Sequence, residues 1–145
     1  MNNKPKEMVS LDIDELGVIE WALEEGLKRL DEKIDEGWEP CGEKEVKRVL
    51  CKVLLRVKET KRMVKKKALG TWLSEEDQHE RTGSLTMTVR ELDAVALACL
   101  REHAKLGLLR RSHPELKGLE EAYALYSGLL SEMLALQKEF SEEGK

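Results

Sequence analysis

Two stretches of the same design, LDIDEL (residues 11–16) and MTVREL (residues 87–92), decide the fold of this chain. In each, an Asp or Thr stands where the first turn of a helix begins. A glutamate three positions later, Glu15 or Glu91, completes a capping box. The apolar residues that flank each box have the spacing of a hydrophobic staple. The sequence therefore predicts two helices that start in the same way, in two copies of one unit.

The offset of 76 residues between these stretches extends without a gap, so that residues 9–60 align on residues 85–136. Few residues are identical between the two copies, but the apolar pattern is shared. A heptad in the second copy has apolar residues at five of the six equivalent positions in the first copy, which is typical of a helix packed along another helix. Its positions in the second copy are Ala122, Tyr126, Leu129, Met133, Leu136 and Phe140.

Composition supports long helices, because Ala, Leu, Glu, Lys and Arg make up more than half of the 145 residues and aromatic residues only 4%. Glycines predict where three of the helices stop. The expected helices cover residues 13–36, 43–69, 89–106 and 115–141.

We therefore predict an all-α fold, a tandem duplication of a long antiparallel helical hairpin that forms a four-helix bundle. An intertwined dimer that exchanges hairpins between chains satisfies the same pattern. The expected organisation is one compact domain with a disordered N-terminus (1–8), a first hairpin repeat (9–70), a linker (71–84) and a second hairpin repeat (85–141).

The overall composition indicates a cytoplasmic protein. The three cysteines have no CxxC spacing, which favours reduced thiols over a disulfide framework. The first residues lack the apolar core of a secretory signal. The longest uninterrupted apolar run has three residues, so no membrane association is expected.

Charge is distributed unevenly, although the net charge is only −4. Residues 44–67 hold 11 basic and 2 acidic residues, whereas residues 12–39 hold 3 basic and 11 acidic residues. One interpretation is that the basic and acidic helices are neighbours whose flanks pair. The other is an anion-binding face for nucleic acid or a phosphorylated small ligand. Its candidate residues are Arg48, Lys52, Arg56, Lys58, Lys61, Arg62, Lys65, Lys66 and Lys67.

Three further residues are candidates for binding. His103 lies on the inward stripe of the third helix, where a satisfied core histidine and a ligand contact are both compatible with the sequence. Trp38 in the first hairpin turn and Trp72 in the linker either cap the ends of the core or contribute to a partner surface.

No motif predicts catalysis, a metal site or a cofactor. The one Glu-x-x-His sequence, at residues 76–79, has no second copy, whereas a di-iron bundle needs two. Glu32-Lys-Ile-Asp35 matches only part of the acidic motif of helical nucleotide pyrophosphatases.

These patterns favour a non-catalytic helical interaction module, an adaptor or inhibitor that binds a partner protein. Such charged, duplicated helical chains are common among small bacterial and phage accessory proteins, and a homodimer is compatible with the hairpin repeat. A binder of nucleic acid or a phosphorylated small ligand is the alternative. A degenerate all-α nucleotide hydrolase is the second alternative.

Overall fold

The computed structural model describes residues 6–35, 43–69 and 83–143, and it confirms an all-α helical bundle. Four long helices pack in pairs, α1 with α2 and α4 with α5, and a short strand precedes each pair. The elements are β1 (Lys6–Leu11), α1 (Ile13–Asp35), α2 (Glu43–Leu69), β2 (Gly83–Met87), α4 (Val89–Ser112) and α5 (Leu119–Glu143).

Both predicted capping boxes are present at the starts of α1 and α4. The backbone N–H of Glu15 donates to Asp12 Oδ1 at 2.8 Å, and the Asp12 N–H donates to Glu15 Oε1 at 3.1 Å. Thr88 and Glu91 make the same reciprocal pair, at 3.3 and 2.9 Å. Two donors that a helix start leaves without partners are satisfied in this way in each repeat.

The duplication is visible in the hydrophobic core. Of the twenty apolar side chains buried in the described part of the chain, eighteen form nine pairs that are 76 residues apart. Each repeat therefore buries the same positions, and neither hairpin could cover this apolar surface alone. The pairs are Leu11 with Met87, Leu16 with Leu92, Ile19 with Val95, Ala22 with Ala98, Leu23 with Cys99, Leu50 with Tyr126, Val53 with Leu129, Val57 with Met133 and Val64 with Phe140.

A two-stranded antiparallel ribbon, which the sequence analysis did not predict, joins the repeats. Met8 pairs with Leu85 and Lys6 with Met87. The expected disordered segment 1–8 thus differs from the structure from Lys6 onward, and the expected linker 71–84 ends in the first residues of β2. Equivalent strands that pair antiparallel place the two repeats about an approximate two-fold axis.

Gly83 lets this ribbon lie close to α2. A Cβ atom at Gly83 would lie 2.7 Å from Thr60 Cγ2 and 3.0 Å from Val64 Cγ2, distances that require one of the elements to move. Glycine is the residue that permits such a close approach.

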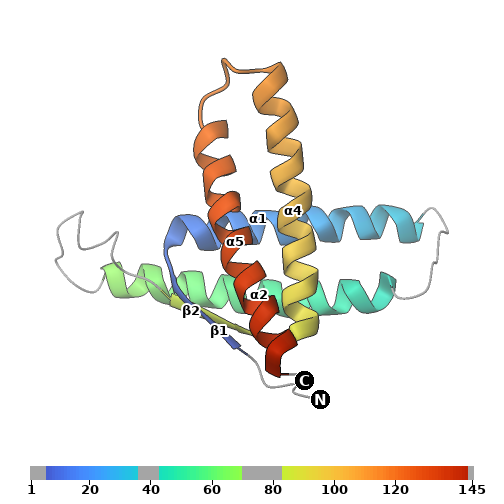
Figure 1. Cartoon of the computed structure of the whole chain (residues 1–145), viewed down its shortest axis with the longest axis vertical. Coiled ribbons are helices and arrows are strands. Elements are labelled where there is room, and N and C mark those ends of the chain that lie inside the picture. Colours follow the sequence, from blue (N-terminus) through green and yellow to red (C-terminus); the bar gives the residue numbers. More distant parts are fainter. Residues whose placement is uncertain (1–5, 36–42, 70–82, 144–145) are drawn as a thin grey trace.

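The two hairpins cross, and the helices that meet at the crossing are α1 and α4 (Figure 1). The tip of the second hairpin projects beyond the first hairpin, so that α4 and α5 pack only on each other there (Figure 1).

The end of α4 corrects the predicted boundary at Gly107. The helix continues to Ser112, and His113 caps it immediately before Pro114. A glycine within a helix costs only about 1 kcal/mol relative to alanine. A Cβ atom at Gly107 would lie 3.5 Å from the ring of Tyr123, so the small residue serves the packing of α4 on α5. In α5 the first residue is Leu119, four positions later than predicted.

Candidate functional site

Basic side chains of α2 pair with the acidic helix α1, as the structural interpretation of the charge pattern predicts. Lys58 Nζ lies 3.6 Å from Glu24 Oε1, and Lys61 Nζ lies 3.4 Å from Glu20 Oε2. A third pair joins Lys47 to an aspartate of α1. Exposed pairs of this kind contribute about 0.2–1 kcal/mol each, and they favour this arrangement of neighbouring helices.

Arg56, another predicted anion-binding residue, instead connects α2 to the start of α4. Its guanidinium donates to Glu91 Oε1 at 2.9 Å and to the Thr86 carbonyl at 2.9 Å, and its second nitrogen lies 2.8 Å from Glu91 Oε2. Burial alone would raise the pKa of the Glu91 carboxyl, but the hydrogen bonds from Arg56 and Thr88 lower that pKa below its ordinary value. Arg56 thus neutralises a buried capping-box carboxylate.

Four of the predicted cations remain available on the outer side of α2. Their side chains are exposed, and within the described residues they make no hydrogen bond or ion pair. They are Arg48, Lys52, Arg62 and Lys65. Lys66 and Lys67 belong to the last turns of α2, and their side chains lie outside the described part of the structure.

His103 joins α4 to α5. Its ring stacks on the Tyr123 ring with 4.3 Å between centroids, and its Nε2 lies 2.9 Å from Ser127 Oγ. The guanidinium of Arg110 covers the other part of this stack, 4.1 Å from the Tyr123 centroid. The imidazole is therefore already engaged by its own chain, which favours the structural role over a ligand contact.

The predicted partner-surface residues Trp38 and Trp72 lie outside the described residues. The third tryptophan, Trp21, is 55% exposed on α1. Its indole N–H donates to Glu102 Oε2 at 3.2 Å.

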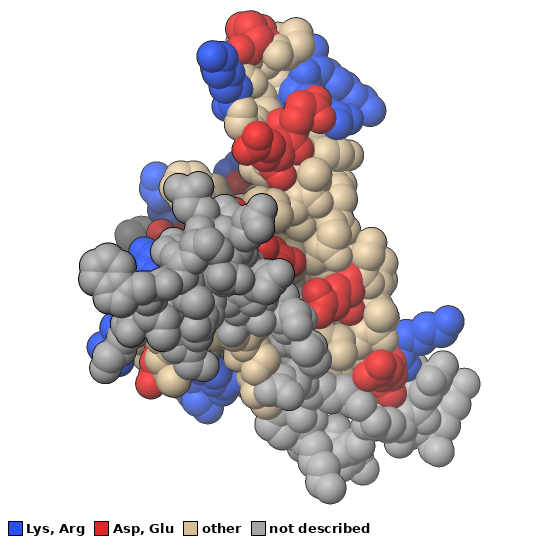
Figure 2. All heavy atoms as spheres, turned by 90° about the vertical axis from the view of Figure 1, so that its left-hand side faces the viewer, with Lys and Arg blue, Asp and Glu red and all other residues tan. Residues whose placement is uncertain are grey.

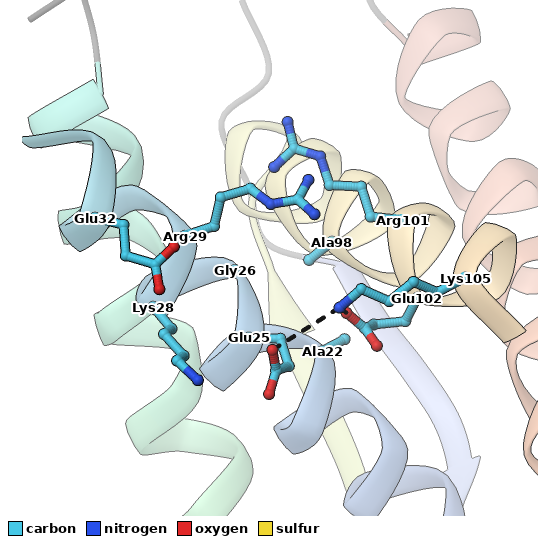
Figure 3. A pocket seen from close by; sticks show the side chains of 10 residues that line it. All are labelled: Ala22, Glu25, Gly26, Lys28, Arg29, Glu32, Ala98, Arg101, Glu102 and Lys105. Atoms are coloured by element: carbon cyan, nitrogen blue, oxygen red, sulfur yellow. Dashed lines mark hydrogen bonds and ion pairs between the residues drawn. The ribbon is translucent and has the colours of Figure 1, made fainter. Parts of the chain in front are cut away.

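A cleft of about 180 Å³ lies where α1 crosses α4 (Figure 3). Small residues form part of its wall, and charged side chains of both signs surround it. Lys105 Nζ lies 3.2 Å from Glu102 Oε1 and 3.9 Å from Glu25 Oε2, and these contacts hold the buried Glu102 between the two helices. The cleft is lined by Ala22, Glu25, Gly26, Lys28, Arg29, Glu32, Ala98, Arg101, Glu102 and Lys105.

The cleft therefore contains a polar network that ties the two repeats together. Four basic and three acidic side chains line it, so their charges nearly balance. Within the described residues, no group of three or more histidine, cysteine or acidic side chains has the geometry to hold a metal ion.

The second hairpin carries a different feature, a groove of about 470 Å³ between α4 and α5 that is mostly apolar. Leu97, Leu100 and Leu134 line it and are 48%, 51% and 65% exposed. A neighbouring hollow of about 340 Å³ between α2 and α4 shares Asp93 and Leu97 with this groove. Figure 2 shows that uncharged residues make up most of the upright column formed by the second hairpin. We call the surface formed by Leu97, Leu100, Leu130, Met133 and Leu134 the apolar face.

The first hairpin provides an internal comparison, because each residue of the apolar face has an equivalent 76 positions earlier. Leu100 and Leu134 correspond to Glu24 and Lys58, which form an ion pair across α1 and α2. One turn away, Ala96 and Gln137 correspond to the ion pair of Glu20 and Lys61. The same seam is therefore closed by charges in the first hairpin and left apolar and exposed in the second.

The sequence analysis missed this face, although the signal was present in the 76-residue alignment. Helical periodicity explained Leu130 and Met133 as core positions. Comparison of the outer positions would have shown Leu100 and Leu134 in place of a charged pair. Single exposed leucines are common on protein surfaces, but a contiguous apolar patch marks a site of interaction.

Comparison of the chain with protein-family models, curated proteins and solved structures gave no match. Among the described residues, none of the helices combines the length and the apolar character that crossing a membrane requires.

Proposed function

We propose that this protein is a non-catalytic helical interaction module, an adaptor or inhibitor, which binds its partner through the apolar face of the second hairpin. The observation that carries the proposal is the contrast between the repeats. Exposure of Leu100 and Leu134, where the first hairpin has Glu24 and Lys58, costs solvation free energy that burial against a partner would recover. The unequal evolution of one seam is what a binding surface would produce.

The partner chemistry that suits this face is an α-helix with one apolar stripe. A groove between two packed helices accepts the side-chain ridge of a third helix. The groove lining is almost entirely apolar, with Asp93, His103 and Gln137 as its polar members. A helix that presents apolar residues at positions i, i+3 or i+4, and i+7 would bury them there.

Selection from a displayed library of helical peptides tests this proposal. The matched control is the double variant L100E/L134K, which transfers the Glu24–Lys58 pair of the first hairpin to the second. Both positions are exposed, so the control should fold like the wild type. We expect peptides with the apolar stripe to be enriched on the wild type and to bind the control at least about tenfold more weakly. Enrichment of no such peptides, or equal binding to both proteins, would contradict the proposal.

A second candidate function, binding of nucleic acid or another polyanion, is favoured by the four cations on α2 that have no partner in the described residues. A polyanion would contact Arg48, Lys52, Arg62 and Lys65 together. Binding of a single-stranded oligonucleotide should then weaken with salt, with a slope of roughly −0.7 per phosphate contact. Replacing all four by alanine should abolish binding, whereas replacing the paired Lys58 alone should leave most of it. Binding that ignores both salt and the fourfold variant would exclude this candidate.

A further inference from the structure

The outer side of α4 is a helical ridge about five turns long. The residues at 93, 97, 100, 104, 108 and 111 are all exposed, and they follow a spacing of 4, 3, 4, 4 and 3. This is close to the spacing of a coiled-coil seam. The ridge spans roughly 27 Å at 1.5 Å per residue. Its side chains are Asp93, Leu97, Leu100, Ala104, Leu108 and Arg111.

The charges on this ridge stand only at its two ends. Asp93 lies near the start of α4 and Arg111 near its end, and the four residues between them are apolar. Gln137 Nε2 donates to Asp93 Oδ1 at 2.8 Å, which orients the carboxylate beside the groove. Arg111 makes no ion pair within the described residues.

We propose that a second copy of this chain occupies the ridge, with the two α4 helices packed antiparallel. The inference rests on the proposed function and names the partner that fills the apolar face. In the antiparallel arrangement, Asp93 of each copy faces Arg111 of the other, and the two contacts are related by a two-fold axis. A parallel arrangement would instead place Asp93 against Asp93 and Arg111 against Arg111, which charge repulsion disfavours.

The sizes of the apolar residues agree with the same register. When residue 93 faces residue 111, Leu100 faces Ala104 and Leu97 faces Gly107 of the other copy. Large side chains then lie opposite small ones, so that the ridges can interdigitate. Leu134 of α5, which is 65% exposed beside the groove, would be covered at the flank of this contact.

The first hairpin could not form the same contact. The positions of α1 that correspond to Leu100 and Ala104 are Glu24 and Lys28, and Glu24 is already paired with Lys58. The contact is thus specific to the second repeat, and the resulting dimer is closed and does not extend into a chain of molecules.

Sedimentation equilibrium of the wild type and three charge variants tests the proposal. We expect a dimer for the wild type. D93R and R111D should each weaken dimerisation by about tenfold, because each turns two attractive contacts into repulsive ones. The double variant D93R/R111D should restore the wild-type dissociation constant, since it exchanges the two charges. Rescue by the double variant is a result that general destabilisation of the fold could not produce.

A wild type that remains monomeric, or a double variant no tighter than the single ones, would overturn the antiparallel dimer. The peptide selection then separates the two proposals. Helical peptides that bind a monomeric wild type and fail to bind L100E/L134K would leave the interaction module standing without self-association. A monomer that enriches no peptides would refute both.

Discussion

Replacing Glu132 by arginine should stabilise this protein. Glu132 of α5 corresponds to Arg56 of α2, and Glu15 corresponds to Glu91, because both pairs are 76 residues apart. Arg56 neutralises Glu91 across one half of the molecule. Across the other half, Glu132 faces the like charge of Glu15, and burial together with that charge raises the pKa of Glu132. The substitution E132R would supply the missing counterpart of Arg56.

The expected gain at neutral pH is about 1–2 kcal/mol in the free energy of unfolding. Removing a repulsion between partly buried carboxylates and forming one ion pair each contribute a fraction of this, discounted for solvent screening. For a chain of this size, the gain corresponds to an increase in Tm of roughly 3–6 °C. The control E132Q removes the repulsion without adding a cation, so it should give about half of the gain.

The pH dependence has a defined sign. A carboxyl whose pKa is raised in the folded state binds its proton more tightly there, so the wild type loses stability as pH rises through that pKa. The advantage of E132R should therefore be largest at neutral pH. It should shrink below the ordinary glutamate pKa of 4.5, where Glu15 becomes protonated. Thermal unfolding followed by circular dichroism measures both effects. The reasoning fails if E132R is no more stable than E132Q at neutral pH, or if its advantage is the same in acid.

Three more predictions concern the joints of the fold. R56M should lower the free energy of unfolding in urea by about 2–3 kcal/mol, because it leaves Glu91 buried without its counter-charge. Since the folded-state pKa of Glu91 is lowered, this contribution should be present above pH 4.5 in the wild type and disappear as pH falls further, and an R56M protein as stable as the wild type would contradict it. G83V should lower Tm more than G83A, because the larger side chain meets α2 at close range; equal Tm values would show that the ribbon can move away. Iodoacetamide should modify the exposed Cys51 and spare Cys99, whose pKa burial raises to about 12, and mass spectrometry of the digested protein would reveal the opposite order if this is wrong.

Much of the fold could be predicted because its signals are local and occur twice. The capping boxes at Glu15 and Glu91 and the heptad through Leu129 depend only on residues near them in the sequence. The short strands escaped prediction because their stability comes from pairing Met8 with Leu85, far away in the chain. Local patterns cannot identify so distant a partner.

The candidate site was harder to predict, because it depends on which side chains are left without partners. The sequence shows that α2 is basic, but it does not show that Arg56 is consumed by Glu91 whereas Arg48 stays available. The apolar face has the opposite character. Leu100 and Leu134 look ordinary one at a time, and they become a surface only when α4 and α5 bring them together.

Methyl NMR of leucine-labelled protein over a dilution series tests most directly whether the apolar face is the binding surface. We expect the methyl resonances of Leu97, Leu100 and Leu134 to shift with concentration, because a second copy covers them at high concentration and leaves them at low concentration. Leu55, which is 69% exposed on α2, serves as the internal control and should not shift. Shifts confined to Leu55, or leucine resonances that stay constant in the dilution series and on addition of helical peptides, would contradict a binding role for the second hairpin.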